Sequence, residues 1–236
     1  MVILITGGAG FIGSNLIHYW LEKHPGDTLL NFDALTYAGN PANLAGVESN
    51  TNYHFFHGDL RKKEQLDEVF ERYSIDAVIH LAAESHVDRS INDPSPFIET
   101  NINGTFHLLE VARKHWQDDL KSHRFVHVST IAATGPGEVD ETTDSHPISN
   151  YGQSKGEGEQ AVRENRKEIP LTIVRPPVVY GERDEGLLDM FRMLQWGLRP
   201  RIGGPKWLSI VHARDLVEGM VQAAESPVAE NETYSR

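Results

Sequence analysis

Cysteine is absent from the 236 residues, which excludes disulfide bonds and metal sites built on thiolates. The sequence also lacks an apolar run long enough to cross a membrane. Residues 2–5 already have the composition of a buried strand, so we expect no signal peptide. Together these absences predict a cytoplasmic protein without membrane contacts.

Positive charge is scarce, because 22 Lys and Arg are set against 34 Asp and Glu, for a net charge of −12. Without a basic stripe, we expect no binding to nucleic acid. The chain has 12 His, but none stands in an HExxH motif or beside a spaced pair of carboxylates. We interpret them as surface and loop residues, and we predict no metal site.

Glycine, by contrast, is concentrated directly after the first apolar run. Gly7, Gly8, Gly10 and Gly13 follow Val2–Ile5, and helical spacing begins at once. A strand, a glycine turn and a helix are the context of a dinucleotide-binding turn, where glycine lets the backbone approach a pyrophosphate. The spacings Gly8-x-Gly10-x-x-Gly13 and Gly7-x-x-Gly10-x-x-Gly13 both satisfy the pattern. A purely structural glycine turn is the alternative interpretation.

An acidic residue supports the dinucleotide interpretation. Asp33 lies twenty residues after Gly13, at the end of a second apolar run over residues 29–32. An acid at this place binds the hydroxyls of the adenosine ribose. No Lys or Arg stands near Asp33 in the sequence to accept a 2′-phosphate, so we predict NAD rather than NADP.

Strand-like apolar runs and helical patterns alternate along the chain. This alternation predicts an α/β fold, a doubly wound parallel sheet of the Rossmann type with helices on both faces. Ligands of such sheets bind at the carboxyl ends of the strands. The expected strands are residues 2–5, 29–32, 53–56, 77–81, 125–128 and 171–174, and the expected helices are 64–73, 97–116, 154–165 and 187–196.

Tyr151 and Lys155 are four residues apart and therefore share one helix face. A tyrosine with its ordinary pKa of about 10 is a poor base. An ammonium about 5 Å away contributes roughly 3 kcal/mol at an effective dielectric near 20, or about two pKa units. We therefore predict that Lys155 lowers the pKa of Tyr151, and that Thr130 binds the same substrate hydroxyl. An ordinary exposed helical turn is the alternative.

Taken together, these motifs resemble the extended short-chain dehydrogenase/reductase family, the NAD-dependent epimerases and dehydratases. The residues fall in the order of that family: 6–13, Asp59-Leu60, Thr130, Tyr151-x-x-x-Lys155 and Arg175-Pro176. Within the family, the first half is similar to the dTDP-glucose 4,6-dehydratases. The segments that carry this similarity are Asp33–Asn40, Ala82–Ser90 and Glu99–Thr105.

The resemblance implies a complete set of site residues. Thr130, Tyr151 and Lys155 would be catalytic, and Ser85 and Thr130 would face the sugar. The implied NAD site consists of Gly7, Gly10, Phe11, Ile12, Gly13, Asp33, Asp59, Leu60, Ala82, Ala83, Thr100, Tyr151 and Lys155.

The second half departs from the dehydratases. Ile131 and Ala132 stand where those enzymes carry the acid and base that remove water, and Val178 and Val179 replace paired Asn residues. Residues 207–216 resemble a broader epimerase or sterol-dehydrogenase type. The chain is also shorter than a usual family member, which suggests a hybrid or truncated chain with a join near residues 125–130, or a divergent member. We predict an NAD-binding domain over 1–176 and a partial substrate lobe over 177–236, with 207–225 packing back on the first domain.

The leading expectation is an NAD-dependent enzyme that oxidises a hydroxyl of a nucleotide sugar and has an impaired dehydration step. An epimerase or sterol-type dehydrogenase of the same family is one alternative, and a non-catalytic NAD-binding scaffold is another. The resemblance also implies a homodimer that pairs the helices near 97–116 and 154–165. The apolar residues expected to contribute to that pairing are Phe97, Ile98, Ile102, Leu108, Leu109 and Val111.

Overall fold

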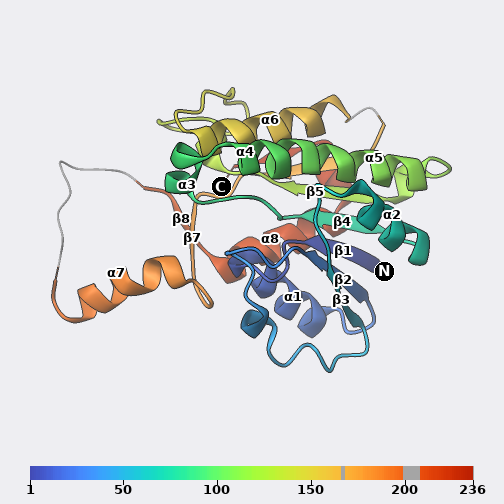
Figure 1. Cartoon of the computed structure of the whole chain (residues 1–236), viewed down its shortest axis with the longest axis horizontal. Helices are drawn as coiled ribbons and strands as arrows, with labels where there is room; N and C mark the ends of the chain where they lie inside the picture. Colours follow the sequence, from blue (N-terminus) through green and yellow to red (C-terminus); the bar gives the residue numbers. More distant parts are fainter. Residues whose placement is uncertain (166–167, 199–207, 236) are drawn as a thin grey trace.

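The computed structural model describes residues 1–165, 168–198 and 208–235. Its centre is a sheet of seven parallel strands in the order β3-β2-β1-β4-β5-β6-β9 (Figure 1). Every apolar run predicted to be a strand forms one of them, so the predicted α/β fold is confirmed. The strands are β1 (Val2–Thr6), β2 (Thr28–Asp33), β3 (Tyr53–His57), β4 (Ala77–His80), β5 (Arg124–Val128), β6 (Leu171–Val174) and β9 (Thr233–Tyr234).

Helices cover both faces of this sheet (Figure 1). Ile3 and Ile5 pack in the core beneath α1 and α8, whereas Leu4 packs on the opposite face with α2, α5 and α6. All three side chains are fully buried, which explains why the first strand is apolar from Val2 to Ile5. The helices are α1 (Phe11–Lys23), α2 (Lys63–Arg72), α3 (Val87–Asn92), α4 (Ser95–Phe97), α5 (Thr105–Trp116), α6 (Asn150–Glu164), α7 (Glu185–Gln195) and α8 (Ala213–Glu225).

The order of the strands reverses at β1. This strand pairs with β2 on one side and with β4 on the other, so the chain builds outward in one direction and then returns to build in the other. The loops that leave the carboxyl ends of β1 and β4 therefore diverge and open a crevice between them. In open α/β sheets this is the place where ligands bind.

Two predicted helices differ in detail from the structure. The helix expected over 97–116 is divided into α4, a π-helical turn at Ile98–Gly104, and α5. Helix α6 begins at Asn150, four residues before the expected start, because the Ser149 hydroxyl accepts a hydrogen bond from the Gly152 N–H and caps the first turn. Tyr151 therefore lies in the first turn of α6, and Lys155 one turn later.

The expectation that every histidine is a surface or loop residue is wrong for two of them. His80 in β4 and His127 in β5 are buried, with ring centroids 5.3 Å apart. The His80 ring lies between the hydroxyls of Thr6 and Thr105, at 2.7 and 2.9 Å. Burial lowers the pKa of His80 to about 3, and it also lowers the pKa of His127. Both rings are therefore neutral parts of the core, because central strands of a covered sheet bury both faces.

The chain after β6 forms a smaller parallel pair, β7 (Val178–Tyr180) with β8 (Ile210–His212). Helix α7 extends away from the sheet, at the lower left of Figure 1, and none of its residues is buried. Helix α8 packs against α1 through Leu216 and Met220. The expectation that residues 207–225 pack back on the first domain concerns this helix; residue 207 itself lies outside the described residues. The domain boundary at 176 stays a prediction.

Within the described ranges, every helix is too short or too polar to span a bilayer.

Candidate active site

A cavity of about 530 Å³ occupies the crevice at the carboxyl ends of β1 and β4. This volume is in the range of cofactor and small-molecule sites. Every residue expected to bind cofactor or substrate lines it: Gly7, Gly10, Phe11, Ile12, Gly13, Asp33, Asp59, Leu60, Ala82, Ala83, Ser85, Thr100, Thr130, Tyr151 and Lys155. The structure thus brings the predicted residues together, while their individual roles stay proposals.

The glycine turn at one end of the cavity has the shape that a dinucleotide requires. Gly7 has a φ of +74°, and a Cβ at this residue would lie 2.7 Å from the backbone of Ala82. A Cβ on Gly13 would collide with the carbonyl oxygen of Gly7. Gly8 instead packs against a side chain of β2 and does not line the cavity. Of the two possible spacings, the one that starts at Gly7 therefore forms the cradle.

Helix α1 points its amino end at this cradle. Its N-cap is Gly10, no side chain caps the first turn, and the turn carries no acidic residue. The free N–H groups and the positive end of the helix dipole therefore face the cavity, an arrangement that attracts phosphate. The cradle and this helix end together fit the pyrophosphate of a dinucleotide.

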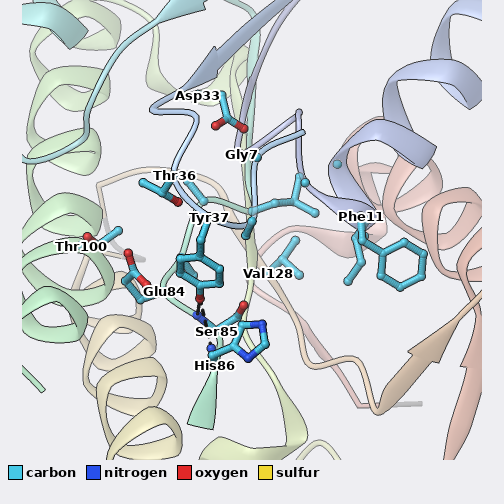
Figure 2. A pocket seen from close by; sticks show the side chains of 18 of the residues that line it. Gly7, Phe11, Asp33, Thr36, Tyr37, Glu84, Ser85, His86, Thr100 and Val128 are labelled. Carbon is cyan, nitrogen blue, oxygen red and sulfur yellow. Dashed lines mark hydrogen bonds between the residues drawn. The ribbon is translucent and has the colours of Figure 1, made fainter. Parts of the chain in front are cut away.

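Asp33 ends β2 beside the cradle and is nearly buried (7% exposed). Its two carboxylate oxygens accept hydrogen bonds from the N–H groups of Ala9 (2.9 Å) and Leu35 (2.8 Å). Figure 2 shows this carboxylate close to Gly7. Each oxygen keeps a further lone pair, so the fixed carboxylate can accept hydrogen bonds from ribose hydroxyls.

Tyr151, Thr130 and Lys155 line the cavity from α6 and the end of β5. Thr130 acts on the Tyr151 phenol, because it lowers the pKa of that group. The buried Lys155 ammonium donates a hydrogen bond to the carbonyl oxygen of Val128, at 2.7 Å. The three side chains are therefore brought together, with the ammonium hydrogen-bonded to the end of β5.

The predicted lowering of the Tyr151 pKa is wrong for the ligand-free protein. Burial raises the pKa of Tyr151 to about 12; the Thr130 side chain opposes this rise and the Tyr37 phenol adds to it. Burial also lowers the pKa of Lys155 to about 8, although Glu159 opposes the effect. The helix spacing placed the two groups on one face, but burial penalises the charged form of each.

Several residues that received no role from the sequence also line the cavity, among them Tyr37, Arg61 and Arg183. Arg61 forms a bidentate pair with Asp59, with a shortest distance of 2.6 Å. Arg183 donates to the Asn15 side chain of α1 at 2.9 Å. Tyr37 lies inside the Asp33–Asn40 segment, and Arg61 directly follows the Asp59-Leu60 motif. Their places beside these motifs could have indicated that both line the site. Arg183 had no local signal, because it reaches the cavity from the chain's second half.

The two positions where the dehydratases carry the acid and base for water elimination lie outside the cavity lining in the described part of the chain. Ile131 and Ala132 occupy these positions and form a short turn after β5. Asp140 follows on an exposed loop, where its carboxylate accepts hydrogen bonds from that same loop. Glu84 and Glu185 do line the cavity. These two side chains are the carboxylates to test for proton transfer there. Among the described residues, no group of three or more His, Asp or Glu is arranged to hold a metal ion.

A doubly wound sheet with a glycine cradle, a nearly buried acid at the end of the second strand and a Tyr-Lys helix is typical of the Rossmann-type dinucleotide-binding class. The chain belongs to the NAD dependent epimerase/dehydratase family, whose model matches residues 3–235. That single range runs through residues 125–130, where the sequence suggested a join.

Relatives with assigned activities are close in sequence. The dTDP-glucose 4,6-dehydratase of Salmonella typhimurium is 45% identical over 191 residues, which cover 74% of this chain and 53% of that protein. The dTDP-glucose 4,6-dehydratase 1 of Escherichia coli K12 is 44% identical over 180 residues, which cover 69% of this chain and 50% of that protein. The chain thus spans about half the length of the curated relatives it matches.

Solved structures agree with this placement. A dTDP-glucose 4,6-dehydratase from Streptomyces venezuelae, solved with NAD and TYD bound, has a TM-score of 0.87 at 35% identity, covering 100% of this chain and 75% of that one. The UDP-glucuronic acid 4-epimerase from Bacillus cereus, in complex with UDP-glucuronic acid and NAD, has a TM-score of 0.85 at 29% identity, covering 99% and 76%.

Proposed function

We propose that this chain binds NAD and a nucleotide sugar and oxidises a sugar hydroxyl by hydride transfer. The observation that carries the proposal is the single cavity in which the glycine cradle, Asp33 and the Tyr151 group all meet. The relatives that bind NAD or act on nucleotide sugars support it. Because the chain spans only part of their length, its own activity has to be tested.

The residues of the cradle fit NAD. The turn from Gly7 to Gly13 and the amino end of α1 would hold the pyrophosphate, and Asp33 would bind the adenosine ribose. A fixed carboxylate at this place repels a 2′-phosphate, which favours NAD over NADP. When bound, NAD supplies the hydride acceptor for the reaction.

Tyr151 would take the proton of the sugar hydroxyl, which Thr130 orients by a hydrogen bond. In the ligand-free protein the phenol is protonated at neutral pH, because burial raises its pKa to about 12. To act as a base it needs a lower pKa, and the Lys155 ammonium, which donates to the Val128 carbonyl oxygen in this structure, is the cation on the same helix face. An ammonium about 5 Å from the phenol lowers its pKa by about two units.

Elimination of water from the oxidised sugar should be slow. General acid and base groups contribute about 10²–10⁴-fold, and Ile131 and Ala132 can transfer no proton. The test is incubation with NAD and dTDP-glucose, followed by absorbance of the NADH formed and of the 4-keto sugar in alkali. We expect NAD binding, weak NADH formation that Tyr151→Phe abolishes, and little 4-keto-6-deoxy product.

Rapid product formation would contradict the slow-elimination proposal, and Glu84→Gln and Glu185→Gln would then show which carboxylate supplies the proton transfer. Tyr19→Phe is the matched control for Tyr151→Phe, because Tyr19 lies on α1 outside the cavity lining.

A second candidate function is 4-epimerisation of a nucleotide sugar. It is favoured by the match to the UDP-glucuronic acid 4-epimerase over 99% of this chain and by the loss of the dehydratase acid and base. A sterol-type dehydrogenase and a non-catalytic NAD-binding scaffold remain the further alternatives from the sequence. Turnover with a panel of UDP- and dTDP-sugars and a sterol separates the enzymes, and NAD binding without any turnover supports the scaffold.

We also propose a homodimer through the π-helical turn, α5 and α6. Most of the apolar residues expected there face the chain's own core, because Phe97, Leu108, Leu109 and Val111 are buried. Ile98 is 49% exposed, so it is the residue of that set best placed to meet a second copy.

A further inference from the structure

Tyr37 lies between the two ends of the cavity. It belongs to the loop that follows Asp33, and its ring lines the cavity together with Ser85 and His86 of the loop after β4. Figure 2 shows the Tyr37 hydroxyl directed at the backbone of those two residues. The residue thus joins the loop at the adenosine end to the loop expected to face the sugar.

The contacts of Tyr37 are specific to a phenol. Its oxygen accepts hydrogen bonds from the N–H groups of Ser85 (3.1 Å) and His86 (3.2 Å). The Arg89 guanidinium stands 4.0 Å from the ring centroid, and the His86 ring meets it edge-on at 5.1 Å. One side chain therefore satisfies two consecutive backbone donors and carries a cation on its ring.

The same loop is fixed from the other side by Asn101, which is buried. Its amide accepts from the Glu84 N–H (2.8 Å) and donates to the Glu84 carbonyl (3.0 Å) and to the Ser154 hydroxyl (2.9 Å). Ser154 is the neighbour of Lys155 on α6. The loop is thus anchored to the catalytic helix by Asn101, and to the cofactor loop by Tyr37.

The cofactor loop is itself tied to the place where NAD is expected. Asp33 binds the N–H of Leu35, and the Asn40 N–H donates to the Ala9 carbonyl at 3.0 Å. Tyr37 lies between these two anchors. A ligand that orders Asp33 and the glycine turn therefore also orders the base from which Tyr37 reaches across the cavity.

We propose that Tyr37 is a positioning residue that transmits order from the NAD-side loop to the Ser85–His86 backbone, so that NAD and a nucleotide sugar bind synergistically. The inference rests on the proposed function. The Tyr37 phenol also acts on Tyr151, whose pKa is raised first by burial and then by this neighbour, which agrees with its place beside the reacting group.

The first test is amide hydrogen exchange on the ligand-free protein and on its NAD complex, comparing wild type with Tyr37→Phe. Two hydrogen bonds of ordinary strength are lost, so we expect Ser85 and His86 to exchange at least about tenfold faster in the variant. In wild type, NAD should slow their exchange by a further fivefold or more, and in the variant it should not. Tyr19→Phe, which removes a hydroxyl from α1, is the control and should leave both amides unchanged.

The second test is calorimetry with dTDP as the probe, with and without saturating NAD. We expect NAD to tighten dTDP binding about fivefold or more in wild type and by less than twofold in Tyr37→Phe. The affinity of the variant for NAD alone should stay within about twofold of wild type. A merely structural residue would weaken both ligands without changing their coupling.

The outcomes separate the two proposals. Equal protection of Ser85 and His86 by NAD in wild type and variant overturns the role of Tyr37. If wild type fails to bind dTDP and other nucleotide diphosphates, the proposed function is refuted, while the exchange experiment still decides whether Tyr37 transmits order from NAD. If NAD itself does not bind, both proposals are refuted.

Discussion

The buried ammonium of Lys155 should destabilise the ligand-free protein at neutral pH, and its replacement by methionine should remove that cost. Lys155 is 5% exposed, and its ammonium has one hydrogen bond to the Val128 carbonyl. Burial lowers its pKa from 10.5 to about 8, with Glu159 acting in the opposite direction. The native state therefore holds this proton less tightly than the unfolded chain does.

The sign of the pH dependence follows from that difference. Between about pH 8 and pH 10.5 the unfolded chain binds the proton and the native protein has released it, so native stability rises with pH in this window. The difference between 10.5 and about 8, at 1.36 kcal/mol for each pKa unit, amounts to about 3 kcal/mol, and about 2.5 kcal/mol of it is regained by pH 10. For a chain of this size that is about 5–10 °C in Tm.

The assay is chemical and thermal unfolding of wild type and Lys155→Met, without NAD, at several pH values from 7 to 10. Loss of the bond to Val128 costs the variant about 1–3 kcal/mol at every pH, so the absolute difference decides nothing. The decisive quantity is the change in that difference with pH. The stability of the variant relative to wild type should fall by about 2.5 kcal/mol from pH 7 to pH 10.

Lys114→Met is the control, because Lys114 lies on the surface beside Asp67 and its pKa is raised by that carboxylate. The stability of Lys114→Met relative to wild type should not fall between pH 7 and pH 10. A difference between Lys155→Met and wild type that is constant from pH 7 to pH 10 would refute the reasoning, since it would mean that the buried amine titrates alike in both states.

Three further predictions concern binding, backbone and assembly. Asp33→Ala should weaken NAD binding by at least about tenfold and NADP binding much less, by calorimetry, and tighter NADP binding by the intact protein would contradict the assigned preference. Gly7→Ala forces a Cβ against Ala82 at a φ of +74° and should lower the free energy of unfolding by about 1–3 kcal/mol or more, whereas Gly26→Ala, which has open space, should change it little. Light scattering should show a dimer that Ile98→Glu weakens, and a 26.5 kDa monomer at high concentration would reject the assembly.

Most of the sheet could be predicted because its central strands are buried on both faces and leave an unbroken apolar run. Val2–Ile5 is an example, and Leu171–Val174 is a similar run interrupted only by Thr172; each is a strand in the structure. The two-residue strand β9 could not be predicted, because it pairs with β6 through a short segment without such a run. The apolar periodicity alone starts α6 at residue 154, whereas the Tyr151–Lys155 spacing already implies a helix from Tyr151; the cap Ser149 extends the helix ahead of its periodic part.

The candidate site was predictable as a set, because parallel strands bring their carboxyl ends to one edge whatever the rest of the chain does. Contacts between loops were not predictable in this way. Tyr37 meets Ser85 across 48 residues, and Arg183 meets Asn15 across 168. No spacing rule connects such pairs, since the path of each loop depends on the packing of both elements that it joins.

The Tyr151–Lys155 pair shows which properties of a site follow from residue spacing and which depend on the surrounding fold. Four residues of separation place both side chains on one face of α6, and this much follows from helix geometry. The direction of the ammonium depends on the free carbonyl of Val128 at the end of β5, which is distant in sequence and adjacent only in the fold. In that position burial lowers the pKa of the amine to about 8 and raises that of the phenol to about 12. At neutral pH the ligand-free site therefore holds a protonated phenol and a charged ammonium, and the proposed role of Tyr151 as a base requires that bound ligands lower the pKa of the phenol.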